Sequence, residues 1–137
     1  MKRFESKVAI VTGAGCVGPG WGNGRAMAVR LAEEGAQVLA VDRDPARLAE
    51  PLERAGAARE SIITCECDVT SSASVKAMAD RAIEAFGRID ILINNVGGSA
   101  PGGPVEMSEE VWDSQVDFNL KSVFLTCKNV LPTMKAQ

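Results

Sequence analysis

The sequence has 137 residues, of which 46% are hydrophobic and 24% are charged, a balance that is ordinary for a soluble globular protein of one domain. The formal net charge of −3 argues against nucleic acid or a membrane surface as a partner. No signal segment precedes the first strand and no apolar run approaches the roughly 18 residues of a membrane span, so we expect a cytoplasmic protein. The four scattered cysteines and the lack of histidine predict no metal site.

The first predicted elements are a buried strand, Val8–Thr12, and a helix over Arg25–Glu34. Between them lies a glycine-rich segment, residues 13–24, with the sequence GAGCVGPGWGNG. A glycine loop between a strand and a helix exposes backbone N–H groups at the helix N-terminus, where the helix dipole favours a pyrophosphate. The segment therefore predicts a nucleotide site. An ordinary surface loop is the alternative, because glycine also serves tight turns.

Two sets of glycines could form the nucleotide turn. Gly13, Gly15 and Gly18 match the pattern G-x-G-x-x-G literally. However, the residues that follow Gly18, with the sequence PGWGN, cannot begin a helix because proline and glycine are the poorest helix formers. We therefore expect the helix to start near Gly24 and the working turn to consist of Gly13, Gly22 and Gly24.

Asp42 ends the second predicted strand, Ala36–Asp42. An acidic residue about 20 positions after the glycines, at the end of the second strand, is placed to bind an adenosine ribose, and it repels a 2′-phosphate. Asp42 therefore favours NAD over NADP, and Arg43 keeps NADP open as the lesser option. As an alternative, Asp42 or Asp44 only caps the helix that Pro45 opens.

The rest of the chain alternates predicted helices and strands. In order, these are a helix Pro45–Ala57 that Pro51 kinks or shortens, a strand Ser61–Cys67, a helix from Ser71 or Ser72 to Gly87, a strand Ile89–Asn95, a loop Val96–Met107 and a helical region Ser108–Met134. The apolar fourth strand predicts burial on both faces, and the last helical region carries an apolar stripe that faces a core or a partner. This order predicts an α/β fold of the Rossmann type, with a doubly wound parallel sheet.

Several separated segments resemble, in order, the motifs of the short-chain dehydrogenases/reductases. These are Thr12–Gly15 with Gly22–Gly24, Asp42, Cys67–Val69, Asn94–Gly97 and Phe118–Asn119. The resemblance extends over essentially the whole chain and corresponds to the N-terminal half of a usual member. It implies an oxidoreductase that uses NAD and acts on a small-molecule secondary alcohol or ketone. A non-catalytic nucleotide-binding module is the alternative; an S-adenosylmethionine methyltransferase is disfavoured by Asn94–Gly97.

The resemblance also implies roles for the matching residues. The predicted cofactor-binding residues are Gly13, Gly15, Gly22, Asn23, Gly24, Asp42, Arg43, Asp68, Val69, Asn95 and Gly97. Among them, Asp68 and Val69 would lie at the adenine, whereas Asn95 and Gly97 correspond to the motif that steadies the central strand beside the cofactor. Asn119 corresponds to the asparagine that interrupts a helix and orders a water in the family's proton relay, and a neutral amide can both donate and accept as a relay requires.

Each of these polar residues also has a simpler structural interpretation. Asp68 could begin a turn before the next helix. Asn94 and Asn95 could be turn residues at the end of a strand, and Asn119 could be a locally bonded helix residue.

The sequence departs from the family pattern in three ways. Cys16–Trp21 stands where one residue is expected, an insertion of five, and Asn23 replaces an apolar residue. The chain has no tyrosine, whereas the family transfers its proton through a Tyr-x-x-x-Lys pair. With the strand order 3-2-1-4, the apolar fourth strand would also lie at an edge. We therefore expect a truncated NAD(P)-binding domain over residues 1–137 that is inactive alone and could form a homo-oligomer through residues 108–134.

Overall fold

The computed structural model describes residues 2–137 and contains one parallel sheet of four strands. The strands are β1 (Val8–Thr12), β2 (Gln37–Asp42), β3 (Ile62–Glu66) and β4 (Ile91–Ile93), and their order in the sheet is β3-β2-β1-β4. The main helices are α1 (Asn23–Glu33), α2 (Ala49–Arg54), α3 (Ser72–Phe86), α4 (Glu109–Val116) and α5 (Ser122–Ala136). The predicted Rossmann-type fold and strand order are confirmed.

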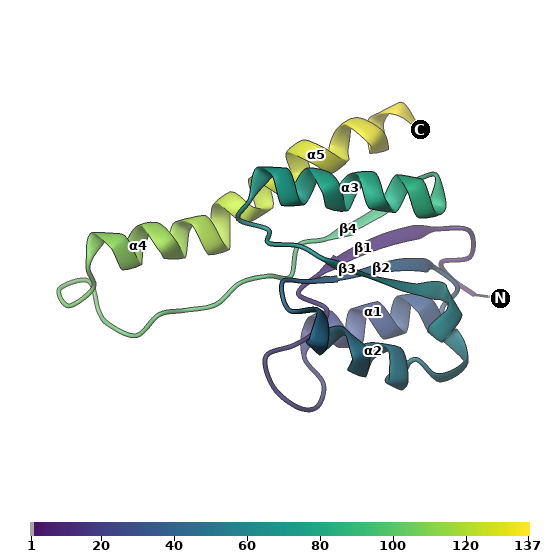
Figure 1. Ribbon diagram of the computed structural model, residues 1–137, viewed down its shortest axis with the longest axis horizontal. Helices are drawn as coiled ribbons and strands as arrows, with labels where there is room; N and C mark the ends of the chain where they lie inside the picture. Colours follow the sequence, from purple (N-terminus) through teal and green to yellow (C-terminus); the bar gives the residue numbers. More distant parts are fainter. Residues whose placement is uncertain (1) are drawn as a thin grey trace.

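Helices cover both faces of the sheet (Figure 1). The helices α1 and α2 lie against one face, α3 and α5 lie against the other, and α4 projects from the end of the sheet. The strands β1 and β2 are buried almost throughout and supply the centre of both hydrophobic cores. On the first face they contact small residues of α1, including Ala28 and Ala32, so that this helix packs closely. No helix within residues 2–137 combines the length and apolarity that a membrane crossing needs.

The helix predicted over Pro45–Ala57 is wrong as one continuous element. The structure has a 3₁₀ turn at Pro45–Leu48, the six-residue helix α2, and a second 3₁₀ turn at Gly56–Ser61. Pro51 is the third residue of α2. Proline is tolerated in the first turn of a helix because its missing N–H would have no intrahelical partner there, so the helix restarts just ahead of Pro51.

The fourth strand is shorter and less buried than the predicted Ile89–Asn95. It covers only Ile91–Ile93, and all of its residues are partly exposed because β4 pairs with β1 alone, at the edge of the sheet. The prediction of burial on both faces is therefore confirmed only in part, since Ile91 and Ile93 pack against one core and Leu92 packs against the other without being fully buried. Only Ile89, which precedes the strand, is fully buried.

The entrance to β4 is tied to the start of β1 through Asp90. The N–H of Val8 donates to Asp90 Oδ2 over 2.9 Å, and the N–H of Asp90 donates back to the Val8 carbonyl over 2.9 Å. The guanidinium of Arg88 donates two further hydrogen bonds to this carboxylate, and Lys7 lies 3.6 Å away. The bonds from Arg88, above all, lower the pKa of Asp90 to about 2.

The predicted helical region Ser108–Met134 is present but interrupted. Ser108 caps α4 by accepting from the Val111 N–H over 3.3 Å, and a π-helical turn, Asp117–Lys121, joins α4 to α5. The predicted apolar stripe consists of Val116, Leu120, Val123, Phe124, Cys127, Leu131 and Met134. It does not coincide with the packed face of α5, because Leu120, Phe124 and Leu131 are exposed, although Met134 packs against the core. That face carries Leu125, Thr126 and Val130 instead. A π turn holds extra backbone for each turn of helix and so changes which residues share a face.

Candidate nucleotide-binding pocket

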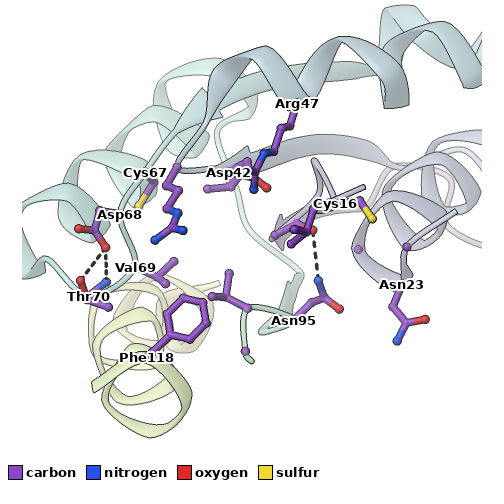
Figure 2. Close-up of a pocket in the computed structure, with 18 residues that line it drawn as sticks. Cys16, Asn23, Asp42, Arg47, Cys67, Asp68, Val69, Thr70, Asn95 and Phe118 are labelled. Carbon is purple, nitrogen blue, oxygen red and sulfur yellow. Dashed lines mark hydrogen bonds between the residues drawn. The ribbon is translucent and has the colours of Figure 1, made fainter. Parts of the chain in front are cut away.

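A pocket of about 320 Å³ lies beyond the carboxyl ends of the four strands. It is lined by Gly13, Cys16, Val17, Gly22, Asn23, Gly24, Val41, Asp42, Arg43, Arg47, Cys67, Asp68, Val69, Thr70, Asn95, Val96, Gly97 and Phe118. Figure 2 shows that Asp42, Asp68 and Asn95, which come from three different strand ends, surround one open space. In open α/β sheets, ligands bind at this edge.

The turn formed by Gly13, Gly22 and Gly24 lies at the pocket as expected, and α1 begins at Asn23 beside it. Gly13 has a left-handed backbone, with φ +65°. At Gly24 an added Cβ would lie 2.8 Å from the carbonyl carbon of Gly13, so only glycine lets the helix approach the loop this closely. Gly18 does not line the pocket, which supports the choice against the literal motif.

The N-terminus of α1 has backbone N–H groups available to a ligand. Its N-cap is Gly22, which has no side chain to accept from the first turn. The first N–H groups of a helix have no intrahelical partners and attract anions. This end of α1 therefore has the chemistry that a pyrophosphate requires.

Asp42 lies at the end of β2 with its side chain turned into the pocket region (Figure 2) and only 8% of the residue exposed. Its Oδ2 accepts from the Gly15 N–H over 3.1 Å, and its Oδ1 accepts from the Asp44 N–H over 3.0 Å. Gly15 itself does not line the pocket. Its N–H instead holds the Asp42 carboxylate, which does line the pocket. The helix cap is Asp44, which accepts from the Ala46 N–H over 3.1 Å, so the alternative role of Asp42 as a cap is wrong.

Two arginines stand beside Asp42 in the pocket lining. Arg43 follows it in the chain, and Arg47 comes from the next 3₁₀ turn, where its Nε lies 3.1 Å from Asp44 Oδ2. Arg43 was expected from the sequence, whereas Arg47 was not. The sequence does not indicate this position, because Arg47 reaches the pocket only through the 3₁₀ turn that follows β2.

Asp68 and Val69 line the opposite wall, after β3. The Asp68 carboxylate accepts from the backbone N–H of Thr70 over 2.9 Å and from its hydroxyl over 2.6 Å, and these bonds lower the pKa of Asp68. Asp68 thus forms the turn that the simpler interpretation expects, and it also faces the pocket. Cys67 beside it is buried, and burial raises the pKa of its thiol.

Asn95 joins β4 to the glycine turn. Its side-chain Nδ2 donates to the carbonyls of Thr12 and Gly13, each over 3.2 Å, and its backbone N–H donates to Thr12 Oγ1 over 3.1 Å. Asn94 points to the other side, where its Oδ1 accepts from the Thr126 hydroxyl over 2.6 Å. Asn95 therefore connects β4 to the glycine turn, and Asn94 connects β4 to α5 on the opposite side. Neither residue has only a turn-forming role.

Asn119 lies in the π turn and does not line the pocket. Its Oδ1 accepts from the Gly98 N–H over 2.9 Å, and its Nδ2 donates to the Gln115 carbonyl over 2.9 Å. The helix interruption that the resemblance implies is present at this residue. The neighbouring Phe118 reaches the pocket instead and forms part of its wall (Figure 2).

Comparison with known proteins identifies a matching family. The family model for short chain dehydrogenase matches residues 7–137. An uncharacterized oxidoreductase of Staphylococcus saprophyticus is 35% identical over 100% of this chain and 57% of its own length. The 3-oxoacyl-[acyl-carrier-protein] reductase of Thermotoga maritima is 33% identical over 98% of this chain and 53% of its own.

Solved structures give the same result. A short-chain dehydrogenase/reductase from Burkholderia xenovorans is 55% identical and superimposes with a TM-score of 0.96, covering 100% of this chain and 54% of that one. A hydroxysteroid dehydrogenase from Escherichia coli is 32% identical with a TM-score of 0.87, covering 98% and 55%. The chain therefore spans about half the length of the relatives it matches.

Proposed function

Because the chain belongs to the short-chain dehydrogenases, a family of oxidoreductases, we propose that its pocket binds NAD and that it forms the cofactor-binding part of an enzyme acting on a secondary alcohol or ketone. When bound, NAD would supply the hydride acceptor. Membership of this family favours an oxidoreductase over a methyltransferase. A nucleotide-binding module without catalysis is the second candidate, because the pocket residues bear on nucleotide binding and not on the chemical step.

The residues present fit a dinucleotide. The strongest support is the close approach of α1 to the glycine turn, where Gly24 leaves no room for a Cβ against Gly13. This approach brings the unpartnered first turn of α1 to the pocket, where it would hold the pyrophosphate. Asp42 would hold the ribose and Asp68 with Val69 would flank the adenine. Asn95 would keep the turn and β4 in register beside the cofactor.

The preference for NAD over NADP rests on the Asp42 carboxylate. This group is nearly buried, so its charge is poorly screened by water and would repel the phosphate that NADP carries on the same ribose. Arg43 and Arg47 would offset part of that repulsion. However, Arg47 already pairs with Asp44, and its charge is therefore partly compensated.

The test is a titration of the purified protein with NADH and NADPH, followed by nucleotide fluorescence. We expect tighter binding of NADH, and we expect Asp42→Asn to reduce the ratio of the two dissociation constants by about tenfold, which corresponds to about 1.4 kcal/mol. Asp113→Asn is the matched control, because it removes an exposed carboxylate that lies outside the pocket and contacts none of its arginines. An unchanged ratio in Asp42→Asn would place the ribose contact elsewhere. Failure to bind either nucleotide would reject the proposal.

Three further expectations belong to the same proposal. Asn119 would act as a positioning residue, because it holds the backbone of Gly98 beside the pocket wall. An oligomer would use the apolar face of residues 108–134, on which Leu120, Phe124 and Leu131 are exposed. Without a tyrosine, the 137-residue chain by itself should bind the cofactor but not turn over a ketone.

A further inference from the structure

The insertion in the glycine segment, Cys16–Trp21, forms a loop that contributes Cys16 and Val17 to the pocket wall. Little packing supports this loop. Val17 is 87% exposed, and a Cβ added at Gly18 or Gly20 would meet no atom within 4 Å. Such a loop is expected to be mobile unless polar contacts fix it, because it buries almost no apolar surface.

Arg25, in the first turn of α1, makes the contacts that hold the loop at both ends. Its side chain is 2% exposed. One terminal nitrogen donates to the carbonyl of Gly15, directly before the loop, and the other donates to the carbonyl of Gly20, near its end. A guanidinium presents its donors in a rigid plane and can therefore fix two carbonyls at once.

The same guanidinium connects the loop to α2. Arg25 lies 2.7 Å from Glu50 Oε2, and Glu50 Oε1 accepts from Arg54 over 2.6 and 2.8 Å. The Arg54 guanidinium stacks over the ring of Trp21, 4.6 Å from its centre. The contacts thus run from Arg25 through Glu50 and Arg54 back to Trp21, which is the last residue of the inserted loop.

The buried arginine is not explained by a contribution to folding stability. Its Nε has no hydrogen-bond partner. Among the buried side-chain nitrogen and oxygen atoms of residues 2–137, it is the one atom that lacks a partner. An unpaired buried donor costs free energy, and a buried ion pair often adds no more stability than apolar packing. What the arginine does provide is a fixed separation between the two ends of the loop.

We propose that Arg25, together with Glu50, Arg54 and Trp21, is a clamp that fixes the inserted loop as one wall of the dinucleotide pocket. Arg25 is a positioning residue, since it does not line the pocket itself. The clamp holds Cys16 against Gly22, the N-cap of α1, where a Cβ on Gly22 would overlap the Cys16 sulfur. The loop wall therefore lies beside the end of α1 that would receive the pyrophosphate. The effect on the cofactor rests on the proposed function.

The experiment compares Arg25→Met and Trp21→Ala with matched controls. Arg30→Met removes an exposed arginine from the same helix, and Trp112→Ala removes a tryptophan that is 62% exposed, compared with 58% for Trp21. We expect Arg25→Met to raise the dissociation constant for NADH at least tenfold and Trp21→Ala to raise it about threefold, with both controls within twofold of the parent. Wild-type affinity in a folded Arg25→Met protein would overturn the clamp. If Arg25→Met does not fold, the affinity of Trp21→Ala tests the clamp, because removal of the exposed Trp21 side chain should leave the fold intact.

A second readout needs no cofactor. The protein has two tryptophans, so Trp112→Phe leaves Trp21 as the single fluorophore. In that background, we expect Arg25→Met to increase acrylamide quenching of Trp21 and lower its anisotropy, whereas Arg30→Met should change neither. Equal quenching in both variants would overturn the clamp even if NADH binds. A protein that never binds NADH but shows the expected quenching would reject the proposed function and keep the clamp.

Discussion

Gly24→Ala tests the closest contact in the pocket. The new Cβ would overlap the Gly13 carbonyl oxygen and lie 2.5 Å from Asn95 Nδ2, whereas ordinary contacts begin at 3.4 Å, so the segments must separate by about 0.9 Å or more. Overpacking costs about 1–3 kcal/mol, and we expect the upper part of this range, about 2–3 kcal/mol, because the clash is with backbone that cannot rotate away. Better helix propensity returns about 1 kcal/mol, which leaves a net cost of about 1–2 kcal/mol. With an unfolding entropy of about 2.1 cal/mol/K per residue, each kcal/mol shifts the Tm of a chain of this size by about 3.5 °C. We expect a fall of about 4–7 °C.

The same substitution should weaken NADH binding at least tenfold, because it moves the first turn of α1 away from the glycine turn. Thermal unfolding by circular dichroism and a fluorescence titration measure the two effects. Gly18→Ala is the control, since a Cβ there meets nothing within 4 Å and should change neither quantity. Equal Tm and affinity in the two variants would refute the argument that close approach of α1 builds the site.

Three further predictions concern other parts of the chain. Asp90→Asn should lower the free energy of unfolding by about 1 kcal/mol at neutral pH. Because the pKa of Asp90 is lowered to about 2, its contribution is present above pH 4 and disappears as the pH falls towards 2. Denaturation curves of the variant and the parent should therefore converge near pH 2. Asn119→Ala should speed hydrogen exchange of the Gly98 amide about tenfold, as measured by NMR, and an unchanged rate would contradict its positioning role. If residues 108–134 mediate association, Phe124→Glu should abolish any concentration dependence of the sedimentation coefficient; persistence of that dependence would point to another surface.

The sequence was sufficient to predict those parts of the fold that depend on local pattern. The order of strands and helices follows from apolar runs and glycine breaks, and Ser71 and Gly87 bound α3 as cap residues do. The start of α1 at Asn23, close to the expected Gly24, could be predicted because proline and glycine disfavour a helix in the residues before it. These features depend on neighbours in the chain, which a single sequence displays directly.

Features that depend on distant contacts could not be predicted in the same way. The strand order predicts that β4 lies at an edge, but the apolar run Ile89–Asn95 does not reveal that the strand covers only Ile91–Ile93. The hydrophobic stripe near Phe124 does not show the change of face at the π turn. Arg25 has the appearance of an ordinary surface residue of a helix. Its burial results from the inserted loop folding over it, together with Glu50 from α2.

The pairing of β4 with β1 has a consequence for how the pocket responds to its ligand. Three residue pairs join these strands, and Asn95 extends the connection to the glycine turn through its bonds to Thr12 and Gly13. Asn95 leaves the glycine turn when β4 detaches, and the pocket then loses one wall. A ligand that requires the complete pocket would shift this equilibrium towards the attached state, by about 2.7 kcal/mol at a concentration one hundred times its Kd. A ligand bound across the pocket would thereby also hold β4 against β1.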